Sequence, residues 1–227
     1  MTKIIAFAGP SLPQSPDSTW KPLLEAVQIR PPAQDGDITA ALDEEPQVLV
    51  LLDGYYFDGC DHLVPAVKPQ ELLSALDAGV QIIGAASMGA IYATELNQYG
   101  IVGVGQVFEW FRDGILQGND ELIILHLPQE FGYQAITVAV AEVRYALQHL
   151  VGDRMISSTD AQFLIQAIKA QPFTERSLDV ILQLARSILD ETTGELLRLA
   201  LTSNSVKQSD AKLALQLAHR LKGFTNR

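Results

Sequence analysis

The stretch QIIGAASMGAIYATEL, residues 81–96, joins an apolar run to a helical pattern through a turn of small residues. Ser87 lies at that turn, with Ala85 before it and Gly89 after it. A small-x-Ser-x-Gly turn between a strand and a helix is typical of a nucleophile elbow, because larger side chains at the flanking positions would collide. The same pattern is also typical of a serine that only caps a helix. Both interpretations of Ser87 stay open on the pattern alone.

Apolar runs like the one before Ser87 recur along the first part of the chain. They are rich in Ile, Leu and Val, and they occur at KIIAFAG (3–9), VLVLLDG (48–54), VQIIGA (80–85) and ELIILHL (121–127). Nearly continuous apolar runs suit strands that are buried on both faces, as in a parallel sheet. Helical patterns such as residues 68–79 separate the runs. The alternation predicts an α/β fold, a Rossmann-like three-layer arrangement with ligand-binding loops at the carboxyl ends of the strands.

The apolar pattern changes to a helical period after residue 129. Amphipathic segments follow at residues 136–150, 158–170, 176–190, 191–201 and 208–221. We therefore expect two domains, an α/β core over residues 1–130 and an all-helical C-terminal module over residues 131–227.

Composition narrows the classes of protein to which this chain can belong. Of its 227 residues, 48% are hydrophobic and 19% are charged, which is enough apolar material for a sizeable core and argues against disorder. The formal net charge of -11 makes the chain a poor binder of nucleic acid and of anionic membrane surfaces. No run approaches the roughly 20 apolar residues of a membrane span, and the first apolar run is too short for a signal peptide. We therefore expect a cytoplasmic protein.

The sequence gives little indication of a metal site or of a nucleotide-binding loop. Cys60 is the only cysteine, which excludes an intramolecular disulfide and the common multi-cysteine zinc sites. Cys60 and His62 are close in sequence, but two such residues are a weak indication of a metal site. No glycine-rich phosphate loop follows a predicted strand. We expect neither a metal nor a cofactor.

A nucleophilic serine needs a base and a group that stabilises the oxyanion. His126 is the preferred base for Ser87, because it ends the predicted strand at residues 121–127, where an α/β site draws its side chains. A histidine that merely closes a strand is the plain alternative. The backbone N–H groups of Met88 and Gly89, at the start of the helix after Ser87, are the expected oxyanion donors.

Three charged residues are candidate supporting groups. Asp53 ends the second apolar run and Glu95 lies on the helix after Ser87, about 12 Å along the helix axis. That distance is too long for direct contact between Glu95 and Ser87. Arg30 precedes two prolines, which favour an extended segment, and its guanidinium is suited to clamp a carboxylate or a C-terminal tail. Each of the three has an ordinary surface role as its alternative.

Several stretches together resemble the TfuA-like protein family. They are GPSLP (9–13), RPPAQDGDI (30–38), VLVLLDG (48–54), ELLSALDAGVQIIGAASMGAIYATEL (71–96), YGIVGVGQVFEWFRDG (99–114) and DELIILH (120–126). Their order and spacing are similar to those of the family over about residues 4–127, whereas the helical part is similar only in character. The chain departs from the family pattern at Tyr92, where a basic residue is common, and around Pro69, where a His-Lys-Glu string is common.

The resemblance implies a role in sulfur transfer. TfuA-like proteins are partners of YcaO enzymes, which activate a backbone amide with ATP so that a thioamide can form in ribosomally made peptides. For this chain the resemblance implies hydrolysis of a thiocarboxylated, ThiS-like carrier protein, with sulfide released to YcaO and only indirect contact with the peptide. The resemblance leaves open whether the chain forms a homo-oligomer. The positions that match the family pattern are Ser87, Gly89, Glu95, Arg30, Asp53 and His126.

Three functions are therefore open at this point. The first is Ser87-dependent hydrolysis of the carrier thiocarboxylate. The second is a non-catalytic, YcaO-binding module that acts allosterically, in which Ser87 is only a helix cap. The third is an unrelated serine amide or ester hydrolase.

Overall fold

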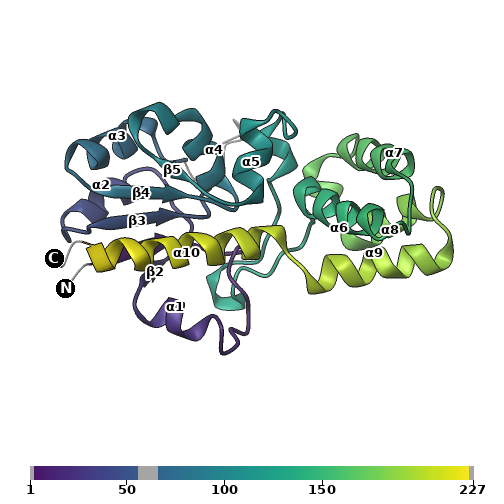
Figure 1. Cartoon of the computed structure of the whole chain (residues 1–227), viewed down its shortest axis with the longest axis horizontal. Coiled ribbons are helices and arrows are strands. Elements are labelled where there is room, and N and C mark those ends of the chain that lie inside the picture. Colours follow the sequence, from purple (N-terminus) through teal and green to yellow (C-terminus); the bar gives the residue numbers. More distant parts are fainter. Residues whose placement is uncertain (1–2, 56–65, 225–227) are drawn as a thin grey trace. The chain divides into compact units, whose positions relative to one another are not determined.

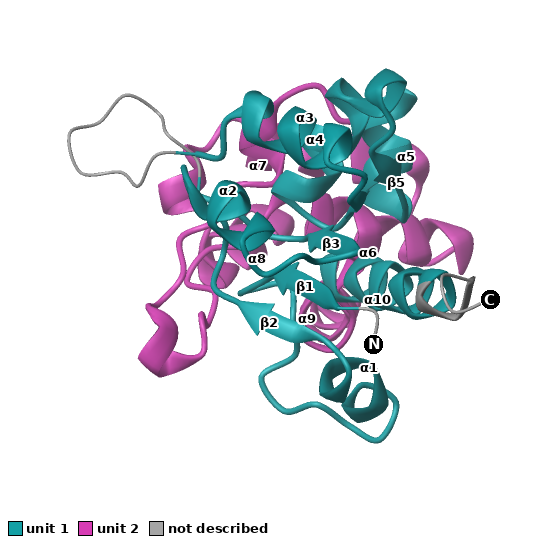
Figure 2. Ribbon diagram, turned by 90° about the vertical axis from the view of Figure 1, so that its left-hand side faces the viewer, with its two compact units in different colours: residues 1–115, 207–227 teal, residues 116–206 magenta. Residues whose placement is uncertain are grey.

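The computed structural model describes residues 3–55 and 66–224. Contacts divide the chain into two compact units, which Figure 2 shows in separate colours. Unit 1 is residues 1–115 and 207–227, and unit 2 is residues 116–206. This division differs from the boundary expected at residue 130, because the predicted strand at residues 121–127 lies in unit 2 and the last helix returns to unit 1.

In the described part of the chain, unit 1 is built on a five-stranded parallel sheet with the strand order β2-β1-β3-β4-β5. The strands are β1 Ile4–Phe7, β2 Gln28–Arg30, β3 Val48–Leu51, β4 Gln81–Gly84 and β5 Val102–Gly103. The predicted strands within residues 3–9, 48–54 and 80–85 are confirmed. The sequence did not predict β2 and β5, which lie at the two edges of the sheet and are short.

The strand predicted at residues 121–127 is wrong, because none of the strands described for the sheet lies there. Asn119–Glu121 form the 3₁₀ helix η2, and His126 makes one isolated antiparallel bridge with Ala135. The physical reason lies at the start of the run. Glu121 is fully buried and paired with Arg144 and Lys169, which fixes this segment to the helices of unit 2.

Helices cover both faces of the sheet, so the predicted α/β three-layer arrangement is confirmed (Figures 1 and 2). One face is covered by α2 Asp37–Leu42, α3 Pro69–Asp77 and α4 Met88–Glu95, with η1 Asn97–Tyr99 and α5 Gln106–Arg112 following α4. The other face carries α1 Lys21–Glu25 and the long helix α10 Val206–Phe224.

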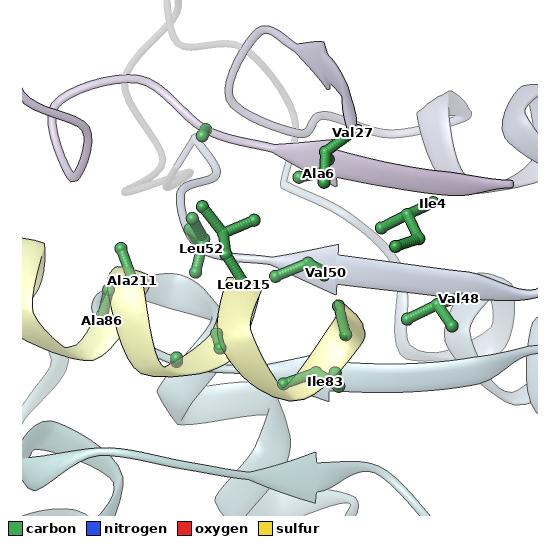
Figure 3. Close-up of a cluster of buried hydrophobic side chains, with 14 of the residues drawn as sticks. Ile4, Ala6, Val27, Val48, Val50, Leu52, Ile83, Ala86, Ala211 and Leu215 are labelled. Carbon is green, nitrogen blue, oxygen red and sulfur yellow. The ribbon is translucent and has the colours of Figure 1, made fainter. Parts of the chain in front are cut away.

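The core under α10 explains why the last helix belongs to unit 1. Figure 3 shows Ala211 and Leu215 of α10 against the sheet residues Val50, Leu52 and Ile83. Alanines at the contact let the helix approach the sheet closely, and the buried apolar surface holds it there.

Unit 2 is helical, which confirms the helical character predicted for this region. Its elements are η3 Gln129–Phe131, α6 Val140–Gly152, α7 Ser158–Lys169, η4 Phe173–Glu175, α8 Leu178–Ala185 and α9 Glu191–Ser203. Its own apolar cluster is centred on Val143, Leu147, Leu164, Ile181 and Leu197. None of the helices in the described ranges has the length and apolar character needed to cross a membrane.

Candidate active site at the carboxyl edge of the sheet

Ser87 lies on a strained turn directly after β4. Ala86 has a positive φ of 66°, and the Ser87 N–H donates to the Ala85 carbonyl at 2.8 Å, which makes a γ-turn centred on Ala86. Such a conformation costs free energy in a residue other than glycine and is found preferentially at functional sites. Within the described chain the Ser87 hydroxyl makes no capping hydrogen bond to α4. The geometry therefore favours the elbow over the simple cap.

Glycines let α4 begin directly against the ends of two strands. A Cβ at Gly89 would lie 1.7 Å from the Leu51 carbonyl oxygen, and a Cβ at Gly84 would lie 2.1 Å from the Gly89 carbonyl oxygen. No side chain larger than hydrogen fits at either position without moving the backbone. The small-residue requirement at Gly89 that the sequence predicted thus has a steric cause.

The same close packing changes the expected oxyanion donors. The Gly89 N–H donates to the Leu52 carbonyl at 3.3 Å, so this predicted donor is already directed at the end of β3. The Met88 amide is the first of α4, where N–H groups have no partner inside the helix. The Met88 amide is therefore the better placed of the two predicted donors.

Among the described residues, Lys207 contributes a side-chain hydrogen bond to Ser87. Its Nζ donates a hydrogen bond of 3.3 Å to Ser87 Oγ, although the two residues are 120 positions apart in the chain. Both belong to unit 1, and Lys207 is only 4% exposed at the start of α10. A lysine beside a serine hydroxyl is one of the known arrangements in which a base activates a nucleophile.

The sequence analysis missed Lys207, although a signal was available. Lys207 and Asp210 stand at the head of the stripe that continues through Ala211, Ala214 and Leu215 at helical spacing, and this stripe is the buried face of α10. Asp210 lies on the apolar face of the helix predicted at residues 208–221, and Lys207 directly precedes that helix. Charged residues at such positions are the exception that points to a role beyond solvation.

Asp53 acts as a loop anchor rather than as an open carboxylate. It is buried, and its oxygens accept hydrogen bonds from the Gly9 N–H at 2.8 Å, the Ser11 N–H at 2.9 Å and the Ser11 hydroxyl at 2.7 Å. These bonds fix the loop after β1 beside the end of β3. In this strand order the β1/β3 boundary is the topological switch point, where α/β sheets bind ligands.

Arg30 is not beside Ser87. It ends β2, three strand spacings or about 14 Å across the sheet from β4. Its guanidinium pairs with Glu44 and lies 5.8 Å from the centre of the Phe7 ring. A role as a clamp stays a prediction.

Glu95 is exposed in the last turn of α4, away from the turn that carries Ser87. Its charge acts on Tyr92 instead. Burial first, and then the negative charges of Glu95 and Glu71, raise the pKa of Tyr92 to about 12. The neutral Tyr92 hydroxyl donates to the Val67 carbonyl at 2.5 Å, a structural contact.

His126 lies in unit 2 and not on the sheet. Its Nδ1 hydrogen-bonds the Leu127 carbonyl at 2.8 Å, and its ring packs edge-on against Tyr133 with the centroids 5.6 Å apart. Because a carbonyl only accepts, Nδ1 carries the proton in this arrangement. The pairing of His126 with Ser87 stays a prediction, and Cys60 and His62 lie outside the described residues.

Comparison with known proteins identifies one family. Residues 58–177 match the model of a family described as TfuA-like protein, a span of more than half the chain. This span includes Ser87 and His126, whereas Arg30, Asp53 and Lys207 lie outside it. Among curated proteins the comparison found no match.

Proposed function

This chain belongs to the TfuA-like protein family, and from that premise we propose that it supports YcaO-dependent thioamide formation by hydrolysing a thiocarboxylated, ThiS-like carrier protein. The observation that carries the proposed chemistry is the 3.3 Å hydrogen bond from Lys207 Nζ to Ser87 Oγ, at the carboxyl edge of an α/β sheet. In this proposal the base is Lys207 and not His126, which the sequence had predicted.

The first step forms an acyl-enzyme. Ser87 Oγ attacks the carbonyl carbon of the carrier's terminal thiocarboxylate, and the hydroxyl proton passes to the neutral amine of Lys207. The tetrahedral intermediate collapses with cleavage of the C–S bond. The sulfur leaves as sulfide, takes up the proton held by Lys207, and becomes available to YcaO.

The second step returns the enzyme to its starting state. Water attacks the Ser87 ester, Lys207 accepts a proton from that water, and the proton passes to Ser87 Oγ as the ester bond breaks. The net reaction consumes one thiocarboxylate and one water and gives one carboxylate and one hydrogen sulfide. Neither an oxidant nor ATP enters this balance.

The surroundings of Lys207 support the role of a base. The proposed mechanism requires the neutral amine of Lys207. Lys207 is 4% exposed, so its amine lies beside Ser87 Oγ with little competition from bulk water. Met88 supports the oxyanion through its backbone N–H at the start of α4.

The test is sulfide release from a thiocarboxylated carrier protein in the absence of YcaO. We expect Ser87→Ala and Lys207→Ala each to lower the rate by about 10²–10⁴-fold. Lys212→Ala is the matched control on the same helix, because Lys212 is half-buried and its Nζ contacts Thr19 Oγ1 at 2.5 Å and not the Ser87 turn. Undiminished release by Ser87→Ala would overturn the nucleophile assignment.

The same experiment separates the other two functions. A wild-type protein that releases no sulfide but increases the affinity of YcaO for its peptide would be a non-catalytic partner. Turnover of simple esters or amides without turnover of the carrier would indicate an unrelated serine hydrolase.

A further inference from the structure

The carboxylate of Asp210 binds the amino terminus of a neighbouring helix. Asp210 Oδ1 accepts from the Gln106 N–H and Oδ2 accepts from the Val107 N–H, each at 2.8 Å, and the residue is 1% exposed. Both amides belong to the first turn of α5, where they have no acceptor inside the helix. A single side chain therefore fastens α10 to the start of α5.

Gly105 makes room for this fastening. It has a φ of 94°, and a Cβ at this position would lie 2.2 Å from Asp210 Cγ. Gly105 belongs to the Gly-Val-Gly string at residues 103–105, which the proposed reaction does not use. The space that Gly105 leaves is the socket of the Asp210 carboxylate, and this gives one glycine of the string a steric role.

The socket is attached to the same frame as the nucleophile. The Val104 N–H donates to the Gly84 carbonyl at 3.1 Å, and Gly84 ends the strand that leads into the Ser87 turn. Asp210 thus connects α10 to the β4–β5 region a few residues from Ser87. Helix α10 is tied to the element that carries the nucleophile, and not only to the apolar face of the sheet.

Lys207 is the second residue of α10, and the first turn of a helix frays unless it is held. The Glu142 carboxylate of unit 2 holds the residues before Lys207, since it accepts from the Ser205 hydroxyl at 2.7 Å and from the Val206 N–H at 2.8 Å. Asp210 holds the same turn to unit 1. Asp210 is one turn further along and therefore lies on the same face as Lys207. A long lysine side chain also loses rotamer entropy when it is held in one place, so a loose helix start would scatter its amine.

We propose that Asp210 is a positioning residue for Lys207, and that its contact with α5 holds the lysine amine at Ser87 Oγ. The proposal rests on the proposed function, because it assigns Asp210 to the same reaction. The Asp210 carboxylate binds the first amides of α5, and the proposal assigns its effect on the reaction to Lys207.

A double-mutant cycle tests whether Asp210 acts through Lys207. We expect Asp210→Ala to lower the rate of sulfide release by about 10²-fold, as a displacement of about 1 Å does in other active sites. In the Lys207→Ala background the same change is expected to have no further effect, because the group that it positions is gone. Gly105→Ala, which pushes the carboxylate out of its socket, should reproduce the effect of Asp210→Ala.

Glu71→Ala is the matched control for the loss of a buried carboxylate. Glu71 is 8% exposed and accepts from the Gly36 N–H at 3.0 Å and the Thr39 N–H at 3.2 Å, so it also fastens one helix to the start of another in unit 1. We expect this variant to lose stability and to keep its rate at a temperature where it is folded. Circular dichroism on every variant confirms that folded protein is compared.

Two results would overturn the proposal. One is an unchanged rate in Asp210→Ala, and the other is an equal further loss in the Lys207→Ala background, which would mean a general structural role. The same double-mutant cycle can be measured without any carrier, from the rate at which a fluorophosphonate labels Ser87. If carrier hydrolysis fails but labelling still shows the cycle, the proposed substrate is wrong and the positioning role stands.

Discussion

Among the described residues, the buried carboxylates of unit 1 bind backbone amides, whereas Glu121, the buried carboxylate of unit 2, also binds two cationic side chains. Asp53, Glu71 and Asp210 each accept hydrogen bonds from N–H groups of loops or helix starts. Glu121 of unit 2 instead accepts from Lys169 Nζ at 2.9 Å and from an Arg144 guanidinium nitrogen at 3.1 Å. The first arrangement orders loops, whereas the second joins segments of a helical scaffold.

This difference between the carboxylates is accompanied by a difference between two lysines, Lys169 of unit 2 and Lys207 of unit 1. Lys169 Nζ binds the buried Glu121 carboxylate within the helical scaffold, whereas Lys207 Nζ binds the Ser87 hydroxyl among its contacts. The proposed function gives the two lysines different roles, although both lie on amphipathic helices.

The largest expected effect comes from exchanging each lysine for a methionine of similar length. Lys207→Met should lower sulfide release by about 10²–10⁴-fold with little change in stability, because the proton acceptor is lost. Lys169→Met should lower stability and leave the rate of the folded protein unchanged. Rates and urea unfolding of both variants check the prediction, and an equal loss of rate in Lys169→Met would contradict it.

Removal of the acid in unit 2 should have the next largest effect. Glu121→Leu leaves Lys169 and Arg144 without their shared partner, and we expect the free energy of unfolding to fall by about 3 kcal/mol. Glu195→Leu is the control, since Glu195 pairs with Arg198 on an exposed helix face and should change little. A loss in Glu121→Leu no greater than in the control would break the comparison between the units.

A smaller effect is expected when an amide-bound carboxylate is changed. Asp53→Leu removes both carboxylate oxygens, so the N–H groups of Gly9 and Ser11 lose their acceptor. We expect a loss of about 2 kcal/mol in the free energy of unfolding. Urea unfolding measures this, and a loss larger than that of Glu121→Leu would reverse the ranking.

The features that could be predicted from the sequence are those that local pattern controls. The strands β1, β3 and β4 are apolar on both faces, and Ser87 is flanked by the small residues that close packing requires. Strand β2 was missed because Gln28–Arg30 is a short, polar edge strand without that pattern.

The features that could not be predicted depend on contacts between distant residues. The run at residues 121–127 is as apolar as a buried strand, but the ion pairs of Glu121 with Arg144 and Lys169 hold it elsewhere. Lys207 reaches Ser87 only because the chain returns to the sheet after the whole of unit 2. No local period in the sequence specifies that return.

The smallest expected effect is a difference in acid sensitivity caused by Glu121. Burial opposes ionisation of this carboxyl, but hydrogen bonds from Lys169, the Gln117 amide and Arg144 outweigh it and hold the pKa of Glu121 below its ordinary value of 4.5. Below that value the unfolded chain binds a proton that the folded protein does not, so the stabilisation is present above pH 4.5 and is lost as the pH falls through the folded pKa.

Wild-type protein should therefore lose stability more steeply than Glu121→Gln as the pH falls below 4.5. The other carboxylates titrate in both proteins and cancel in the difference. Thermal unfolding measured across this range gives the two slopes. Equal slopes would mean that the cations of unit 2 do not stabilise the charged form of Glu121, and the distinction between amide-bound and cation-bound carboxylates would then rest on geometry alone.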